Sequence, residues 1–205
     1  MDKKVLLINT PQENVVKAGI EDDFIDIIGY YPPLGLLYIG TILKQKGYEV
    51  KIIDCVPQKI DYHEIENIIK NFNPFAVGIT TFTMSMVDVL KTAEIVKKVN
   101  SEIFTVLGGH HINLYQKESI KYSNIDFTLS GEGEETFPQL LEYLAENKSN
   151  EDLIKIQGLG FYRDGKEYIN PQKAYISEIE KLPIPDHSFL PLGIYKSIVG
   201  KNKMV

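Results

Sequence analysis

Cysteine is almost absent from this sequence, because Cys55 is the only one among 205 residues. A single thiol excludes an internal disulfide, a zinc knuckle and a complete set of iron–sulfur ligands, since each of these requires several cysteines. Cys55 follows a predicted strand, which favours a buried structural thiol over a reactive one.

Clustered basic residues are also missing. The chain has 22 lysines and arginines, of which only Arg163 is an arginine, and its formal net charge is −6. Nucleic-acid-binding proteins carry basic patches, and none is visible here. We therefore expect no nucleic-acid partner.

Long apolar runs are absent as well. A membrane-spanning helix needs roughly 20 consecutive apolar residues, and the sequence contains no such run. The first apolar run, residues 5–8, is too short for the apolar core of a signal peptide. We therefore expect no membrane partner and a cytoplasmic location.

The first 150 residues alternate between two patterns. Short segments rich in apolar residues at 5–8, 49–53, 75–79, 103–107 and 125–129 predict strands, of which 5–8 and 103–107 read as buried, and apolar residues at helical spacing lie between them. This alternation predicts an α/β fold with a five-stranded parallel, doubly wound sheet of the Rossmann-like or flavodoxin-like type. The expected strand order is 2-1-3-4-5.

The pattern changes after residue 150. Residues 156–162 and 167–169 flank Asp164-Gly165, a dipeptide typical of a two-residue hairpin turn. Prolines 183, 185 and 191 then indicate an extended connector. We divide the chain into a Rossmann-like domain at residues 1–150, a β-hairpin extension at 151–178 and a linker at 179–205.

Four loops should meet at one edge of the sheet, because ligands of open α/β sheets bind at the carboxyl ends of the strands. Glycines there let a ligand approach the main chain. The predicted binding residues, in chain order, are Asn9, Thr10, Pro11, Thr80, Thr81, Phe82, Thr83, Ser85, Gly108, Gly109, His110, His111, Gly131, Glu132, Gly133, Glu134 and Glu135.

Several of these residues also have structural interpretations. Adjacent histidines on a turn before a helix starting at Asn113 would point in different directions, so His110 and His111 make a poor metal site. One of them could hydrogen-bond a ligand, or both could be structural. The glutamates could cap a helix, and the hydroxyls are ordinary helix-entry residues. We assign no catalytic residue and no metal ligand.

Two common nucleotide signatures are missing. No Gly-x-Gly-x-x-Gly follows the first strand, and no Gly-x-x-x-x-Gly-Lys-[Ser/Thr] occurs, which argues against a dinucleotide or nucleoside triphosphate. Residues 12–33 form an unusually long connection, which could be a lid over a large ligand or a short packed helix.

Three motifs carry a family resemblance. Pro32-Pro33-Leu34-Gly35-Leu36, Leu107-Gly108-Gly109-His110-His111 and Gly131-Glu132-Gly133-Glu134-Glu135 resemble the N-terminal half of B12-dependent radical SAM proteins, which are class B radical SAM methyltransferase-like. Residues 158–163 and 182–186 are similar to that family's bridge to its next domain.

The resemblance implies cobalamin as the cofactor. Methionine-synthase-like B12 domains place Asp-x-His-x-x-Gly after the first strand, whereas this chain has Asn9-Thr10-Pro11-Gln12-Glu13. The resemblance therefore implies base-off cobalamin without a protein histidine on cobalt, its nucleotide tail near Thr80 and Gly108-Gly109. The resemblance further implies methyl transfer to an unactivated carbon, a reaction that such cobalt suits.

The resemblance also implies a partner domain. The family's Cys-x-x-x-Cys-x-x-Cys motif, which holds a [4Fe-4S] cluster for S-adenosylmethionine, should follow the proline connector, and the chain ends at Val205 first. We expect a piece of a longer protein, not catalytic alone, whose C-terminal radical SAM domain lies beyond. The alternatives are a non-catalytic flavodoxin-like module that binds FMN or another nucleotide-like ligand, and a hydrolase, for which no nucleophile motif is present.

Overall fold

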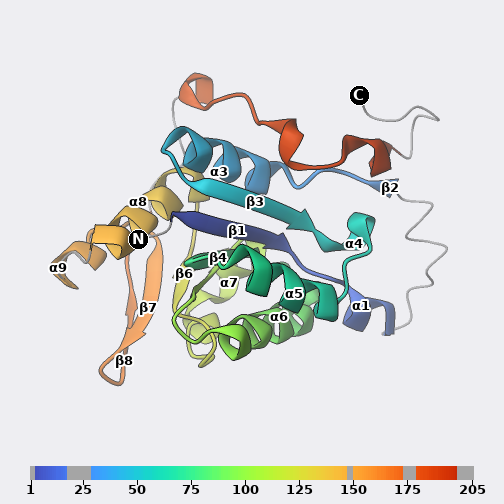
Figure 1. Cartoon of the computed structure of the whole chain (residues 1–205). Coiled ribbons are helices and arrows are strands. Elements are labelled where there is room, and N and C mark those ends of the chain that lie inside the picture. Colours follow the sequence, from blue (N-terminus) through green and yellow to red (C-terminus); the bar gives the residue numbers. More distant parts are fainter. Residues whose placement is uncertain (1–2, 18–28, 147–149, 173–178, 198–205) are drawn as a thin grey trace.

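The computed structural model describes residues 3–17, 29–146, 150–172 and 179–197. Within these residues, seven strands form one sheet with helices on both faces (Figure 1). The sheet order is β3-β1-β4-β5-β6-β7-β8. The strands are β1 (Lys4–Asn9), β3 (Glu49–Asp54), β4 (Ala76–Thr80), β5 (Phe104–Gly108), β6 (Phe127–Leu129), β7 (Leu159–Arg163) and β8 (Lys166–Ile169).

The parallel part of the sheet confirms the predicted α/β class and strand order. β1 pairs in parallel with β3 and β4, and β5 pairs in parallel with β4 and β6. β1 is buried on both faces, as its unbroken apolar run predicts. The order changes direction between β1 and β4, which is where ligands bind in such sheets.

The predicted strand number was wrong. The hairpin β7–β8 does not stand apart from the five parallel strands but continues their sheet, because β7 pairs antiparallel with β6. Leu159 and Phe161 of β7 are buried in the same core as β6. The turn residues Asp164 and Gly165 both have positive φ, 49° and 75°, as a type I′ hairpin requires.

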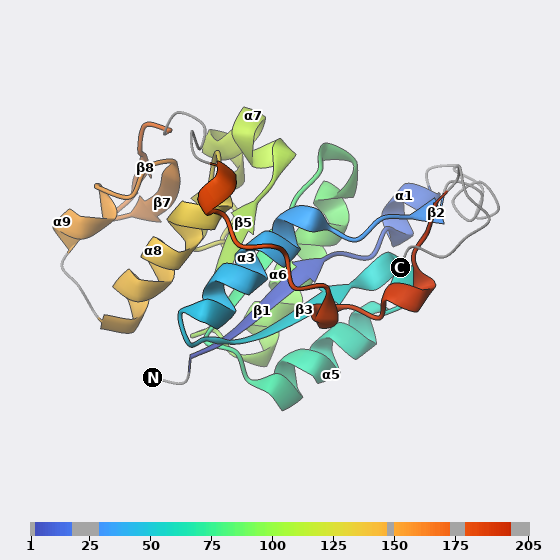
Figure 2. The ribbon, with the colours of Figure 1, turned by 90° about the horizontal axis from the view of Figure 1, so that it is seen from above.

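Helices cover the two faces of the sheet (Figure 2). α3 (Leu34–Gln45) and α8 (Gly133–Glu146) pack on one face with Leu7, and α5 (Tyr62–Phe72), α6 (Met86–Val99) and α7 (His110–Ser119) pack on the other. The shorter elements are α1 (Glu13–Lys17), β2 (Gly29–Tyr30), α4 (Cys55–Gln58), α9 (Asn150–Leu153) and β9 (Lys196–Ser197), with 3₁₀ turns at Thr83–Ser85, Ile179–Lys181, His187–Phe189 and Leu192–Ile194.

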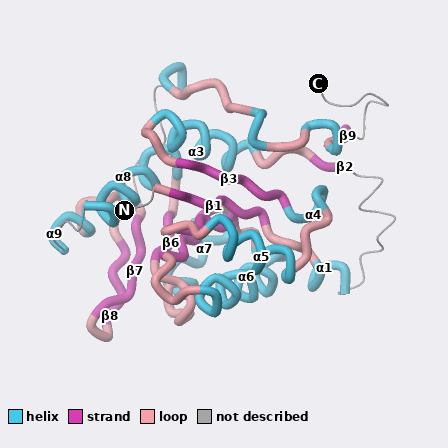
Figure 3. Tube along the Cα trace, viewed as in Figure 1, coloured by secondary structure: helices cyan, strands magenta, loops and turns pink. Residues whose placement is uncertain are grey.

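Residues 179–197 form a strap that lies along α3 (Figure 3). The Asp186 carboxylate pairs with Lys44 at 2.7 Å, and the Asp186 amide donates to Thr41 Oγ1 at 2.8 Å. Tyr195 is fully buried, and β9 pairs with β2. The connector predicted from its prolines is therefore anchored on the domain where it is described.

Further sequence expectations concern Cys55, membrane-spanning helices and the predicted lid and linker. Cys55 is buried and free, as predicted, and burial raises the pKa of its thiol. Across the described ranges, no helix is both long and apolar enough to cross a bilayer. Residues 18–28 of the predicted lid and 198–205 of the predicted linker lie outside the described residues.

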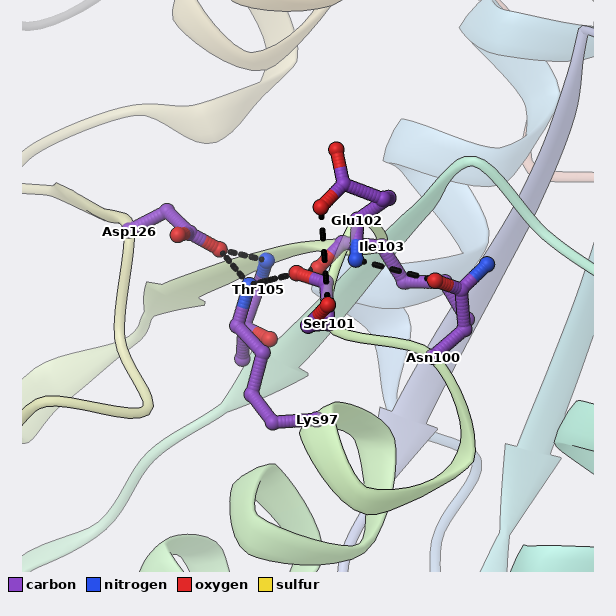
Figure 4. Close-up of polar contacts among 7 residues, drawn as sticks. All are labelled: Lys97, Asn100, Ser101, Glu102, Ile103, Thr105 and Asp126. Carbon is purple, nitrogen blue, oxygen red and sulfur yellow. Dashed lines mark hydrogen bonds and ion pairs between the residues drawn. The ribbon is translucent and has the colours of Figure 1, made fainter.

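An ion pair lies at the amino-terminal ends of β5 and β6 (Figure 4). The Lys97 ammonium donates to Asp126 Oδ2 at 2.6 Å and to the carbonyl of Ile103 at 2.8 Å. The amide of Thr105 donates to the same Asp126 oxygen at 2.7 Å. These contacts tie α6 to the starts of β5 and β6.

We predict that Lys97→Met lowers the free energy of unfolding by about 1–3 kcal/mol, because it leaves a half-buried carboxylate and a buried carbonyl without their shared donor. Urea unfolding measures the change. Lys98→Met is the matched control, since Lys98 forms an exposed pair with Glu66, and its loss should cost less than about 1 kcal/mol. Equal losses in the two variants would contradict this interpretation.

Candidate functional site

A cavity of about 800 Å³ opens at the carboxyl-terminal edge of the sheet. It lies between the sheet and the first turns of α3 and α8, on the face that carries Leu7. The residues that line it are Leu7, Asn9, Tyr31, Pro33, Leu34, Gly35, Leu36, Ile39, Gly78, Ile79, Thr80, Phe82, Val106, Gly108, Gly109, His110, Asn113, Leu129, Gly131, Glu132, Gly133, Glu134, Phe137 and Gln172.

The two glycines after β5 have different structural reasons. Gly109 has φ of 99°, and an added Cβ would lie 2.8 Å from the amide nitrogen of Thr81. That backbone is fixed, because Thr81 donates to the Gly108 carbonyl and accepts from the His111 amide. The fold therefore requires glycine at 109.

Gly108 is not required in this way. The nearest atom to an added Cβ is the Leu129 carbonyl oxygen, at 3.9 Å, an ordinary contact distance. Gly108 nevertheless lines the cavity. A bare main chain at this point suits a ligand that lies against it.

The two histidines face different surroundings, as predicted. His110 is exposed and lines the cavity, with its ring 5.5 Å from that of Phe82. His111 is buried, 3.1 Å from Thr83 Oγ1 through Nδ1, and packs against the ring of Tyr115. Burial lowers the pKa of His111, and the charge of Glu118 opposes that shift.

The predicted start of this helix at Asn113 was wrong. α7 begins at His110, because Gly109 turns the chain into the helix directly after β5. Asn113 has another role, in which its Oδ1 accepts from the Gly131 amide at 2.8 Å and from Ser130 Oγ at 3.2 Å. It thereby fixes the loop that leads into α8.

The acidic loop contributes two carboxylates to the cavity, Glu132 and Glu134. Glu134 is half-buried, and this burial raises the pKa of its carboxyl, with a smaller contribution from the charge of Glu132. A hydrogen bond that this carboxylate accepts from its own backbone amide opposes the shift. Gly131 has φ of 92°, and an added Cβ there would lie 2.8 Å from Nε2 of Gln172, in the segment after β8.

The cavity brings together part of the predicted set. Asn9, Thr80, Phe82, Gly108, Gly109, His110, Gly131, Glu132, Gly133 and Glu134 line it, whereas Thr10, Pro11, Thr81, Thr83, Ser85, His111 and Glu135 are not among the lining residues. Thr10, Pro11, Thr81 and Ser85 are buried in the fold. Ser85 exchanges hydrogen bonds with the backbone of Phe82, which agrees with its helix-entry interpretation.

Sequence reasoning did not assign the wall formed by α3 to the site. Leu34, Gly35 and Leu36 of this helix line the cavity, and the motif at residues 32–36 was the signal that could have identified them. Asn113 and Gln172 also line it. No local pattern marks Gln172, because its place depends on the hairpin joining the sheet.

The fold and cavity are those of a doubly wound, ligand-binding domain. The family of B12 binding domains matches residues 22–141, more than half of the chain. The chain therefore belongs to the B12-binding domain family, which confirms the resemblance identified from its motifs.

Relatives with named activities are longer proteins. The chain is 33% identical to an uncharacterized methyltransferase of Pyrococcus horikoshii, over 95% of this chain and 40% of that protein. It is 28% identical to the anaerobic magnesium-protoporphyrin IX monomethyl ester cyclase of Rubrivivax gelatinosus, over 88% of this chain and 33% of that one. The chain thus spans less than half of these relatives.

Solved structures share the fold. The radical S-adenosylmethionine methyltransferase TsrM from Kitasatospora setae, with cobalamin and a [4Fe-4S] cluster bound, superposes with a TM-score of 0.67 at 18% identity, over 83% of this chain and 31% of that one. The cobalamin-dependent S-adenosylmethionine radical enzyme OxsB, with aqua-cobalamin bound, gives 0.70 at 15% identity, over 89% and 24%.

We predict that Gly109→Ala lowers the free energy of unfolding by about 1–3 kcal/mol, because alanine is strained at this φ and meets the Thr81 backbone. Gly108→Ala should change it by less than about 1 kcal/mol, since its Cβ has room. Thermal or urea unfolding compares the two neighbours, and equal destabilisation would contradict the distinction.

We predict that Glu134→Gln stabilises the protein near pH 7 and gives little gain at about pH 4. Because the folded-state pKa of Glu134 is raised, the folded state binds this proton more tightly, and stability falls as pH rises through that pKa. Unfolding at both pH values measures the effect. Glu94→Gln, on the exposed side of α6, is the control, and a gain that does not depend on pH would contradict the assignment.

Proposed function

We propose that this chain binds cobalamin in the cavity at the carboxyl edge of its sheet. The observation that carries the proposal is Gly108, a cavity-lining glycine that packing does not require, in a chain that belongs to the B12-binding family. A cavity of about 800 Å³ is in the range of small-molecule sites. It suits the nucleotide tail of the cofactor, and the larger corrin ring would then lie at the rim.

The residues present fit such a ligand. The apolar walls from Leu36, Ile39 and Phe137 would exclude water from the tail. Glu132 and Glu134 could accept hydrogen bonds from amide groups of the corrin edge. Bound cobalamin would supply a cobalt centre able to carry a methyl group, and this chain's own residues would bind and orient the cofactor.

We further propose that cobalamin is bound base-off and without a histidine on cobalt. The segment after β1 has no histidine, and its Thr10 and Pro11 are buried in the fold. His111 is engaged with Thr83 and lies outside the cavity lining. His110 lines the cavity and is therefore the histidine to test.

The whole protein would be a cobalamin-dependent radical SAM enzyme. Relatives named as methyltransferases support methyl transfer, for which we propose an unactivated carbon as the acceptor. A relative named as a cyclase makes ring formation the second possibility. In this proposal a C-terminal radical SAM domain holds the [4Fe-4S] cluster and S-adenosylmethionine, as the names of the solved neighbours suggest.

We predict that the purified chain retains hydroxocobalamin through gel filtration and gives a base-off absorption spectrum. Gly108→Val should lose most of the bound cofactor without a large loss of thermal stability, because its side chain would occupy the tail site. FMN, the ligand of the flavodoxin-like alternative, should not be retained.

His110→Ala provides the second arm of this experiment. An unchanged spectrum in this variant would support cobalt without a histidine ligand, and a changed spectrum would contradict it. Failure of the wild-type chain to retain cobalamin, in both oxidised and reduced forms, would contradict the proposed function.

A further inference from the structure

A buried hydrogen-bonded triad connects the strap to the cavity. Asp54, at the end of β3, is 2% exposed. Its Oδ1 accepts from Asn9 Nδ2 at 2.8 Å, and its Oδ2 accepts from the hydroxyl of Tyr195 at 2.9 Å. Tyr195 is fully buried and lies 141 residues further along the chain. Asn9 lines the cavity.

The triad fixes the orientation of an amide. A carboxylate is acceptor-only, so the side of the Asn9 carboxamide that faces Asp54 must be its NH₂ group. The Tyr195 hydroxyl occupies the second Asp54 oxygen, which satisfies a carboxylate that would be costly to bury alone. Among the described residues no hydrogen bond reaches Asn9 Oδ1, so this oxygen remains as an acceptor on a residue that lines the cavity.

The strap that carries Tyr195 is held at several points. Lys44 pairs with Asp186 and lies over the ring of Phe189. At the far end, Tyr30 of β2 pairs with Lys196 of β9, and Tyr31, the residue after β2, lines the cavity. The docked strap therefore reaches the cavity through Asn9 and through Tyr31.

We propose that Tyr195 and Asp54 are positioning residues that hold Asn9 Oδ1 as a hydrogen-bond acceptor for the ligand. The site would thereby select an amide N–H or a hydroxyl at this point and discriminate against a group that can only accept. In naming cobalamin, whose amide side chains and ribose hydroxyl are such donors, the inference rests on the proposed function. It also makes full affinity depend on the docked strap.

A double-mutant cycle tests the inference. Tyr195→Phe removes only the hydroxyl and should weaken hydroxocobalamin binding about threefold to tenfold, as expected for one lost hydrogen bond. Asn9→Ala should weaken it at least as much. If Tyr195 acts through Asn9, Tyr195→Phe adds nothing in the Asn9→Ala background. Additive losses in the double variant would overturn the inference.

Tyr162→Phe is the matched control. It also removes a tyrosine hydroxyl, one that donates to the Gly165 carbonyl at 3.0 Å in the hairpin. The affinity for hydroxocobalamin should not change in this variant. A loss equal to that of Tyr195→Phe would overturn the inference, because it would mark a general effect of a missing hydroxyl.

A measurement without ligand separates this inference from the proposed function. The side-chain amide signals of Asn9 in a ¹⁵N NMR spectrum can be assigned by their loss in Asn9→Ala. They should shift in Tyr195→Phe and stay in place in Tyr162→Phe. Signals that do not respond to Tyr195→Phe overturn the positioning role, whereas a wild-type chain that fails to bind cobalamin but shows the shift overturns only the proposed function.

Discussion

The parallel register of four strands is the constraint on which the site depends. Asn9 pairs with Asp54 on one side and with Thr80 on the other, and Thr80 pairs in turn with Gly108. Residues that are up to 99 positions apart (Asn9 to Gly108) thus reach one edge, because the strands run in the same direction. A slip of one residue would reverse every side chain between the two faces. The buried runs of β1 and β4 make such a slip costly, so the core that stabilises the fold also aligns the site.

Two segments outside the parallel sheet complete the cavity. The hairpin β7–β8 leads to Gln172, which lies close to Gly131. The carbonyl of Gly158, the residue before β7, accepts from the Ser130 amide at 2.9 Å. The strap is linked to the cavity-lining Asn9 through Tyr195 and Asp54. The acidic loop and Asn9 are therefore each held by a part of the chain far away in sequence. The sheet sets where the site lies, and these additions set how its polar groups are presented.

Short runs rich in apolar residues were enough to predict the parallel strands and their order, because most residues of β1, β4, β5 and β6 are buried. The hairpin was predicted from Asp164-Gly165, but its pairing with β6 was not, since no local pattern states which edge a hairpin joins. α7 starts at His110, three residues before the predicted Asn113, because Gly109 adopts a positive φ. The sequence alone does not show which φ a glycine adopts. The places of Asn113, Gln172 and Tyr195 depend on long-range contacts, which is why motif reading could not assign them.

The rim shows why neighbouring residues of one motif have different roles. Gly109 lies close against the Thr81 backbone, where a Cβ has no room, and His111 lies 3.1 Å from Thr83 Oγ1, so the fold constrains both residues although Gly109 also lines the cavity. Gly108 and His110 line the cavity without such a packing constraint. Tyr31, Leu34 and Phe82, which also line the cavity, are 55%, 52% and 42% exposed. Large apolar side chains gathered on one exposed rim usually mark a surface that another molecule covers. A ligand that fills the cavity with its tail and covers the rim with a broad ring would bury all three, and this supports the proposal of cobalamin over a ligand no larger than the cavity itself.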